Sequence, residues 1–318
     1  MRPAPHTLRV VFLGTSEVAR PALDALAGHP EIAVSLVVTQ PDRPGGRGMK
    51  LHPSPVRVRA GELGLPVLAP ESVRDPSPLE KIAAVHPDLL AVAAYGQFLP
   101  GRLLKIPRLA SVNLHPSLLP RYRGAAPVPW AILNGDTETG VTIQHVSRRM
   151  DAGDMIFQHR EPIRPDDTSP DLLGRLSREG ARLMVEAALR LRDGTAPRTP
   201  QDESQVVLAP ALTREDGRLD WTRPAVELER RVRALIPWPG THAFGPGGGE
   251  DRLKIHAAQV APGEGEPGTI LEVSEPGILV ACGEKALRLT QVQPAARPRM
   301  PAAAYARGAR IEAGMRLG

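Results

Sequence analysis

The 318-residue sequence predicts an α/β protein, with a Rossmann-like, mostly parallel sheet followed by a smaller β domain. The first observation is that the chain begins with a strand, a helix and a strand, at residues 8–14, 17–27 and 32–38. This order is typical of a parallel βαβ unit. The second is that short strand-like pieces between turns replace this pattern beyond residue 209, as in a small barrel or sandwich.

The remaining elements follow from hydrophobic periodicity and from glycine and proline breaks. In the first domain we predict helices at 54–63, 79–85, 127–133 and from Ser169 or Asp171 to about 191, and strands at 66–68, 88–95, 111–115, 141–146 and 155–163. In the second we predict a helix at 226–235 and strands at 252–256, 268–273, 277–281 and 286–292. The predicted domain limits are 1–192 and 209–318, joined by a polar linker at 193–208.

The composition is that of a globular protein, with 42% hydrophobic and 24% charged residues. A single cysteine, Cys282, excludes an internal disulfide and suits a reducing compartment. The first residues lack the apolar core of a signal peptide, and no apolar run has the length of a membrane span. We therefore expect a cytoplasmic protein without a membrane partner, and a monomer as the simplest state.

The net charge of +5 is unevenly placed along the chain. Basic residues are in excess between Arg43 and Arg59, and from Lys285 onward seven Lys and Arg face one acid, Glu312. A solvated surface accounts for either cluster alone. Two clusters at the ends of a near-neutral chain indicate a polyanionic partner that touches both.

The long connection at residues 39–56 holds part of this basic charge. It contains three glycines and four prolines, with Arg43, Arg47 and Lys50 interleaved. Connections of this length without regular structure are usually functional or disordered. The two interpretations are a mobile surface loop and a flexible basic arm that folds onto phosphates.

The sequence lacks the signature motifs of several classes of binding and catalytic site. Gly14 is followed by Thr-Ser-Glu-Val-Ala, so the glycine fingerprint of NAD-binding folds is absent. The histidines and the one cysteine do not form a paired metal-ligand spacing, so no metal is expected. Neither a P-loop nor the glycine-flanked serine of a hydrolase is present.

Asn113 and His115 remain as the candidate catalytic residues. Strand alternation places both side chains on one face where a strand ends, and such ends bind ligands in open α/β sheets. Asp151 and Asp154, in a later turn, are the acids that could orient the histidine. An amide beside an imidazole–carboxylate pair suits acyl transfer, although a structural histidine and a turn-holding asparagine are the alternative.

Longer motifs carry a family resemblance. Residues 112–124 read Val-Asn-Leu-His-Pro-Ser-Leu-Leu-Pro-Arg-Tyr-Arg-Gly, and residues 150–154 read Met-Asp-Ala-Gly-Asp. Together with the motifs at 39–48, 94–100, 124–127, 236–240 and 293–295, they span almost the whole chain. The sequence resembles the 10-formyltetrahydrofolate-dependent formyltransferase family, and within it the enzymes that act on methionyl-tRNA.

The resemblance implies a formyltransferase fold followed by an OB-like β-barrel domain that binds tRNA. It implies Asn113, His115 and Asp151 as the catalytic residues. The implied tetrahydrofolate site is formed by Ser117, Leu118, Leu119, Pro120 and the backbone near Tyr95. The implied tRNA contacts are Arg43, Arg47 and Lys50, with Arg43 nearest the acceptor end.

The implied reaction transfers the formyl group of 10-formyltetrahydrofolate directly to the amino group of initiator methionyl-tRNA, for translation initiation. Asn113 and protonated His115 would stabilise the oxyanion, and Asp151 would pair with the imidazolium. Arg121 and Arg123 could meet folate, tRNA or the neighbouring acidic turn. The alternatives are a related formyltransferase or hydrolase with another acceptor, and a non-catalytic RNA-binding protein.

Overall fold

The structure is a computed structural model that describes residues 7–45, 50–246 and 252–318. The chain forms two compact units. The first comprises Met1–Gly124, Glu138–Pro162 and Leu173–Leu208, and the second comprises Ala125–Thr137, Ile163–Leu172 and Ala209–Gly318. Two short internal segments thus group with the C-terminal part, and the predicted domain limits remain a prediction.

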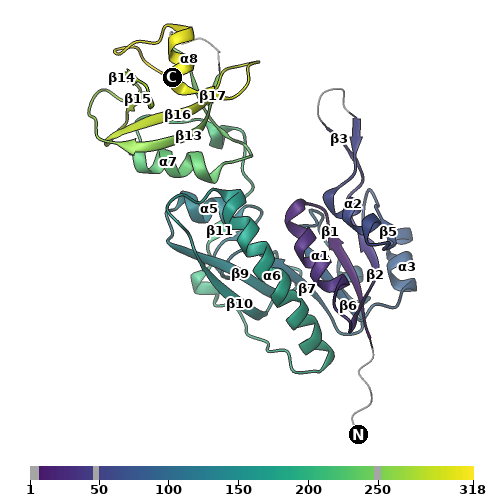
Figure 1. Cartoon of the computed structure of the whole chain (residues 1–318). Coiled ribbons are helices and arrows are strands. Elements are labelled where there is room, and N and C mark those ends of the chain that lie inside the picture. The colour runs from purple at the N-terminus through teal and green to yellow at the C-terminus, as the bar shows by residue number, and fades with distance from the viewer. Residues whose placement is uncertain (1–6, 46–49, 247–251) are drawn as a thin grey trace. The chain divides into compact units, whose positions relative to one another are not determined.

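The first unit is built on one twisted sheet (Figure 1). Its strands are β1 (Leu8–Gly14), β2 (Ile32–Val38), β5 (Val67–Leu68), β6 (Leu89–Ala93), β7 (Ala110–His115), β9 (Glu138–His145) and β10 (Met155–Pro162). They lie in the order β10-β9-β7-β6-β1-β2-β5, parallel from β7 to β5 and antiparallel at β9 and β10. The predicted Rossmann-like, mostly parallel sheet is confirmed.

The helices of this unit follow the predicted order with shifted ends. They are η1 (Glu17–Ala19), α1 (Arg20–Ala27), α2 (Pro55–Glu62), α3 (Pro76–Ala84), α4 (Gly101–Leu104) and, from Leu173 onward, α6 (Ser169–Arg192). Helix α3 begins three residues before the predicted start, because Asp75 has the extended backbone of an N-cap and Pro76 takes the first helical position. Helix α4 was not predicted, since four residues are too few to show a period.

The expectation of a 39–56 connection without regular structure is wrong. Strands β3 (Arg43–Gly45) and β4 (Lys50–His52) form a short antiparallel pair, with Arg43 opposite His52. The hydroxyls of Thr39 and Ser54, which flank this pair in the sequence, lie 2.6 Å apart in a buried contact. Ser54 also caps α2 by accepting from the Arg57 amide. The sequence did not predict these strands because the segment is rich in glycine and proline, which are rare in sheets.

Helix α6 packs closely on one face of the sheet, beside β7 and β9 (Figure 1). A Cβ at Gly180 would lie 2.6 Å from Leu114 Cδ1 and 3.0 Å from Val141 Cγ2. Leu114 alternates with Asn113 and His115 along β7, so these two side chains point to the opposite face. The helix therefore covers the Leu114 face of β7 and does not cover the face that carries Asn113 and His115.

We expect Gly180→Ala to destabilise the first unit, because its methyl group meets fully packed side chains. Overpacking of this kind costs about 1–3 kcal/mol, against a helix-propensity gain of about 1 kcal/mol. Gly174→Ala in the same helix is the control, since its Cβ would meet only Arg178 Nη1 at 3.9 Å. Urea unfolding should show Gly180→Ala below the parent and Gly174→Ala at or above it. Equal stabilities of the two variants would contradict the close approach of α6 to the sheet.

The second unit is an antiparallel sheet with helices. Its strands are β12 (Thr241–Phe244), β13 (Arg252–Ala261), β14 (Ile270–Ser274), β15 (Gly277–Ala281), β16 (Ala286–Gln293) and β17 (Met300–Pro301), in the order β12-β13-β16-β15-β14 with β17 beside β16. Its helices are α5 (Pro127–Leu133), α7 (Ala225–Ala234) and α8 (Ala302–Ala309). Its core includes Trp221, Leu253 and Leu289.

The predicted β character of this unit is confirmed, with differences in the elements. Strand β13 continues to Ala261, five residues past the predicted end, through two irregularities in its pairing with β16. Strands β12 and β17 and helix α8 were missed. Helix α8 buries only small residues, Ala302, Ala303 and Ala306, so no large apolar side chain marks its buried face in the sequence.

None of the helices in the described part of the chain is both long enough and apolar enough to cross a membrane.

Candidate functional site

The site is assembled on the polar face of β7 and β9. The antiparallel register sets Asn113 opposite Gln144 and His115 opposite Thr142. Residues directly opposite on neighbouring strands share a face, so these four polar side chains form one patch. Both β9 residues are buried. The predicted neighbours Asn113 and His115 are thus joined by two polar residues that were not predicted.

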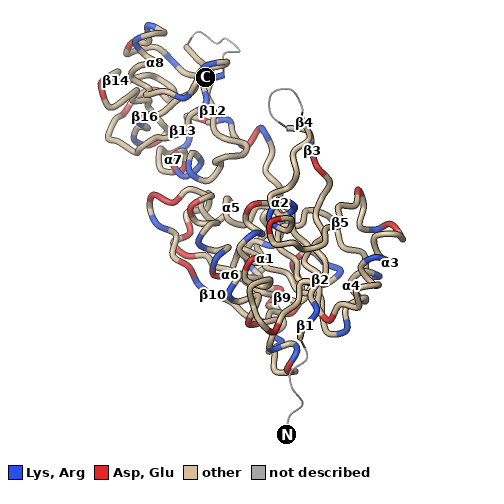
Figure 2. The backbone as a smooth tube through the Cα atoms, turned by 45° about the vertical axis from the view of Figure 1, so that its right-hand side comes forward, with Lys and Arg blue, Asp and Glu red and all other residues tan. Residues whose placement is uncertain are grey.

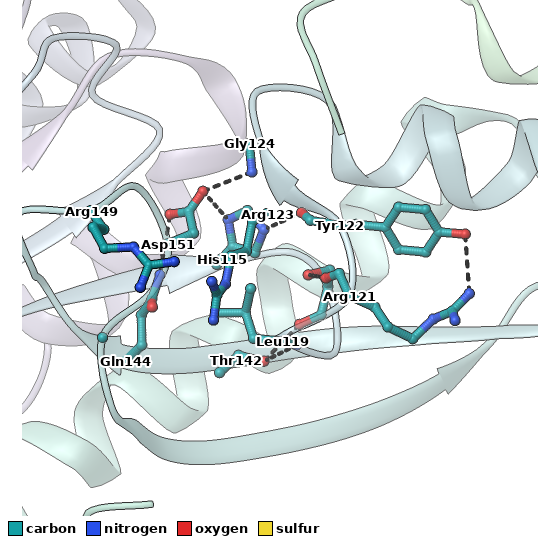
Figure 3. A network of polar contacts seen from close by, with 12 residues as sticks. His115, Leu119, Arg121, Tyr122, Arg123, Gly124, Thr142, Gln144, Arg149 and Asp151 are labelled. Carbon is teal, nitrogen blue, oxygen red and sulfur yellow. Dashed lines mark hydrogen bonds and ion pairs between the residues drawn. The ribbon is translucent and has the colours of Figure 1, made fainter. Parts of the chain in front are cut away.

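Both ring nitrogens of His115 face oxygen atoms, and only 5% of its side chain is exposed. Its Nε2 lies 2.8 Å from the carbonyl oxygen of Tyr122, and its Nδ1 lies 3.6 Å from Asp151 Oδ2 (Figure 3). A carbonyl oxygen can only accept, so Nε2 carries a hydrogen and Nδ1 faces the carboxylate.

The Asp151 carboxylate is fixed on both oxygens. Oδ2 accepts from the Gly124 amide at 2.9 Å, and Oδ1 accepts from Gln144 Nε2 at 3.2 Å (Figure 3). Asp151 itself has a φ of 49°, in the left-handed region that few side chains adopt. The turn also needs a glycine at 153, because a Cβ there would lie 1.7 Å from the His145 carbonyl oxygen. The turn is therefore tightly constrained beside the histidine.

The two acids of this turn face different partners. Asp154 pairs with Arg198, whose Nε lies 2.5 Å from its Oδ2. Asp151 is the one whose carboxylate faces His115. The geometry thus separates the two candidates that spacing left open, while the catalytic roles of Asn113, His115 and Asp151 remain predictions.

Asn113 differs from its neighbours in having an unused amide. Its side chain is partly exposed and makes no hydrogen bond to any residue that the structure describes. The surrounding polar side chains, by contrast, are bonded to one another. Asn113 is therefore the amide donor available to an incoming oxygen on this face.

The loop predicted to line the folate site is bound to the sheet through its own polar groups. The buried Ser117 hydroxyl donates to the Arg121 carbonyl at 2.7 Å. Thr142 Oγ1 donates to the Ser117 carbonyl at 2.7 Å and accepts from the Leu119 amide at 3.2 Å. Leu118, Leu119 and Pro120 complete this stretch, with Leu118 packed over Gly140. The loop has a fixed shape, and its folate role stays a prediction.

Tyr95 lies at the end of β6 with its ring in the core. Burial raises the pKa of its phenol to about 12, and the hydroxyl has no partner among the described residues. Its carbonyl oxygen accepts from Thr15 Oγ1 at 2.7 Å and Gln40 Nε2 at 3.0 Å. These contacts tie together the carboxyl ends of β1, β2 and β6. The role of the backbone near Tyr95 in binding folate stays a prediction.

Arg123 is a site neighbour whose partners the sequence did not reveal. Its buried guanidinium donates to Gln201 Oε1 and to Glu203 Oε1, both at 2.9 Å. Arg149 also donates to Glu203, and the two guanidinium groups lower the pKa of that carboxyl to about 2. The guanidinium of Arg121 stacks over the Tyr122 ring. Arg123 therefore has structural partners within the first unit.

The predicted tRNA-binding residues lie on the β3–β4 hairpin. Arg43 is exposed at the start of β3 and Lys50 begins β4, while Arg47 lies outside the described residues. Acidic and basic positions are interspersed along both units (Figure 2). Four basic residues of the two predicted clusters are paired internally, through Arg57–Asp42, Arg59–Asp24, Arg288–Glu272 and Arg316–Glu266. Arg43 is the exposed basic residue of this hairpin whose side chain the structure describes.

Within residues 7–45, 50–246 and 252–318, no three His, Cys, Asp or Glu side chains are grouped so that they could hold a metal ion.

Comparisons with known proteins cover nearly the whole chain. Residues 8–188 match the formyl transferase family model, and residues 211–310 match that of the formyl transferase C-terminal domain. The methionyl-tRNA formyltransferase of Geobacter sulfurreducens is 45% identical over 98% of this chain and 97% of its own length. That of Stutzerimonas stutzeri is 48% identical over 92% of both chains.

A solved structure with the same fold is HypX from Aquifex aeolicus in complex with tetrahydrofolic acid. It superposes on 94% of this chain and 47% of its own with a TM-score of 0.62, at 19% identity. The fold, the two family models and the full-length similarity agree. The chain therefore belongs to the methionyl-tRNA formyltransferase family of formyl transferases.

Proposed function

We propose that the chain transfers the formyl group of 10-formyltetrahydrofolate to the α-amino group of initiator methionyl-tRNA. The observation that carries the chemistry is the unused Asn113 amide beside the His115–Asp151 pair on one strand face. An amide donor, an imidazole and a carboxylate are the groups that acyl transfer through a tetrahedral intermediate needs.

The attack begins with the neutral amine of methionine approaching the carbon of the N10-formyl group. As the new C–N bond forms, the formyl oxygen takes up negative charge. Asn113 donates an N–H to this oxygen, and the His115 imidazolium adds positive charge nearby. One such donor contributes about 3–4 kcal/mol to the transition state.

Collapse of the intermediate requires a net proton transfer. The amine loses a proton and N10 of the folate gains one as its bond to the formyl carbon breaks. His115, or a water held by Asp151, relays this proton, an effect worth about 10²–10⁴-fold. The fixed Asp151 carboxylate keeps the imidazolium in place during the step. No covalent enzyme intermediate is required.

The proposed formyl acceptor, methionyl-tRNA, is inferred from features other than Asn113, His115 and Asp151. The relatives that match this chain end to end are named for methionyl-tRNA, and the C-terminal unit is present here as well. The exposed Arg43 on its hairpin supplies a positive group for a phosphate. We also predict a monomer in the cytoplasm with domains at 1–192 and 209–318, the second being an OB-like tRNA-binding domain.

The deciding experiment offers labelled 10-formyltetrahydrofolate with three acceptors in parallel: methionyl-tRNA, glycinamide ribonucleotide and a nucleotide-linked amino sugar. We expect label only in methionyl-tRNA. Label in another acceptor, or release of free formate alone, would replace this proposal by a related transferase or hydrolase. No reaction with any acceptor would favour a non-catalytic protein.

We expect Arg43→Ala to weaken the use of tRNA without changing folate binding. The KM for methionyl-tRNA should rise several-fold, and the slope of log affinity against log salt should fall by about 0.7–0.9 for one lost phosphate contact. Arg160→Ala is the charge-matched control, since Arg160 is exposed and pairs with Glu138 on the neighbouring strand. A rise in the Kd of tetrahydrofolate with unchanged tRNA use would contradict this role of Arg43.

A further inference from the structure

The segment after α6 is bonded to the first unit along its length. Met155 and Thr199 exchange backbone hydrogen bonds of 2.8 and 2.9 Å, and the Arg123 amide donates to the Val207 carbonyl at 3.0 Å. Between these two points, the side chain of Gln201 reaches the turn that carries Asp151. A segment predicted as a linker from its polarity thus contacts the candidate site.

The Gln201 amide group is surrounded by acceptors. Its Nε2 lies 2.8 Å from the Asp151 carbonyl oxygen, 2.7 Å from the Gly153 carbonyl oxygen and 3.2 Å from Gln144 Oε1. Its Oε1 accepts from Arg123 Nε at 2.9 Å. The contact with Arg123 fixes which end of the amide is the donor, so both N–H groups face the turn and Gln144.

The same contacts set the orientation of the second amide. Because Gln144 Oε1 faces the donor of Gln201, Gln144 Nε2 faces the other way, and it donates to Asp151 Oδ1. Gln201 therefore acts on Asp151 twice, through the backbone carbonyl and through Gln144 on the carboxylate. A continuous chain of hydrogen bonds runs from Arg123 to the carboxylate beside His115.

This support matters because the Asp151 backbone is strained. A left-handed φ on a residue other than glycine costs of order 1–3 kcal/mol and persists only where the surroundings impose it. The carbonyls on both sides of Ala152 are held by one donor group, Gln201 Nε2. Without it, relaxation of the turn would move the carboxylate away from His115.

We propose that Gln201 is a positioning residue, which sets the Asp151 carboxylate against His115 from outside the reacting centre. The catalytic part of this inference rests on the proposed function of Asp151, whereas the structural part does not.

Kinetic measurement of Gln201→Ala provides the first test. We expect kcat to fall roughly 10- to 100-fold, as for a group displaced by about 1 Å, with the KM for folate almost unchanged. Gln205→Ala is the matched control, because Gln205 is exposed in the same segment and bonds only within it, to Asp202. It should keep the parent rate, and equal rates for both variants would overturn the proposal.

Gln201→Glu separates positioning of the turn from support of Arg123. The glutamate keeps an oxygen for Arg123 but turns a second oxygen toward three acceptors, so kcat should fall at least as far as in the alanine variant. A parent-like rate would show that only the Arg123 contact matters. In an Asp151→Asn background, Gln201→Ala should have less than a roughly 3-fold further effect, since coupled residues are not additive. An undiminished effect there would refute action through Asp151.

Hydrogen exchange at the Gly124 amide provides a test that requires no formyl-acceptor substrate. Its N–H donates to Asp151 Oδ2, so it reports whether the carboxylate is held. We expect exchange at least about 10-fold faster in Gln201→Ala and unchanged exchange in Gln205→Ala. If the parent protein fails to formylate methionyl-tRNA, the proposed function falls, and this exchange still decides the structural role. Parent-like protection of Gly124 in folded Gln201→Ala would overturn the inference.

Discussion

Asn113→Ala should lower kcat for formyl transfer by about 10²–10³-fold, the loss typical of one oxyanion donor. The structure makes this residue hard to replace. His115 Nε2 is bonded to the Tyr122 carbonyl, and the buried Gln144 amide is bonded to Asp151, whereas the partly exposed Asn113 amide has no partner among the described residues. The loss should appear in kcat with little change in the affinity for folate, because the donor acts on charge that develops only in the transition state.

Asn113→Asp is the stringent companion to this variant. It keeps the size of the side chain and replaces the N–H donor by an oxygen, so it should be at least as slow as the alanine variant. Equilibrium binding of tetrahydrofolate and the melting temperature would show that both variants are folded. A rate within about 3-fold of the parent in folded Asn113→Ala would remove Asn113 from the reacting centre, since one lost donor should cost far more.

Alternation along a single strand was enough to predict the neighbours at the strand end. Asn113 and His115 share a face because they are two residues apart in β7. The same rule applied to β9 would have found Thr142 and Gln144 between Val141, Ile143 and His145. These residues were missed because the pairing of β7 with β9 depends on the sheet order, which local periodicity does not determine.

Strand alternation could not predict the contacts made by turns and by the segment after α6. Asp151 and Asp154 stand three residues apart in one polar turn, and the folded turn, with its left-handed backbone at Asp151, places the Asp151 carboxylate beside His115. Gln201 and Arg123 are 78 residues apart in sequence. A polar, proline-containing segment has the composition of a solvated linker, so its hydrogen bonds to a site cannot be inferred without coordinates.

Two residues of β9 anchor different parts of the site through their hydrogen bonds. Thr142 joins the 117–119 loop to the sheet, and Gln144 joins Asp151 to the same strand. The loop and the acidic turn are therefore anchored on adjacent same-face positions of β9. A change in the position of β9 would move both, which links the predicted folate loop to the predicted catalytic acid through one strand.

Asp151→Asn should lower kcat by about 10²–10⁴-fold, while Asp154→Asn should stay within about 3-fold of the parent. The two substitutions make the same chemical change three residues apart in one turn. At Asp151 the substitution removes the negative charge that faces the His115 ring and replaces one carboxylate oxygen that accepts from Gly124 or Gln144 by a donor. At Asp154 it weakens only a partly exposed ion pair with Arg198, and such pairs contribute little.

Single-turnover transfer from labelled 10-formyltetrahydrofolate would measure both variants without interference from product release. Tetrahydrofolate binding should be retained in each, because neither carboxylate belongs to the predicted folate loop at 117–120. The opposite ranking, with Asp154→Asn slow and Asp151→Asn near the parent rate, would mean that the turn rearranges when substrates bind. It would then be Asp154 that pairs with His115 during the reaction, and the contact of Asp151 with Gly124 would serve the fold alone.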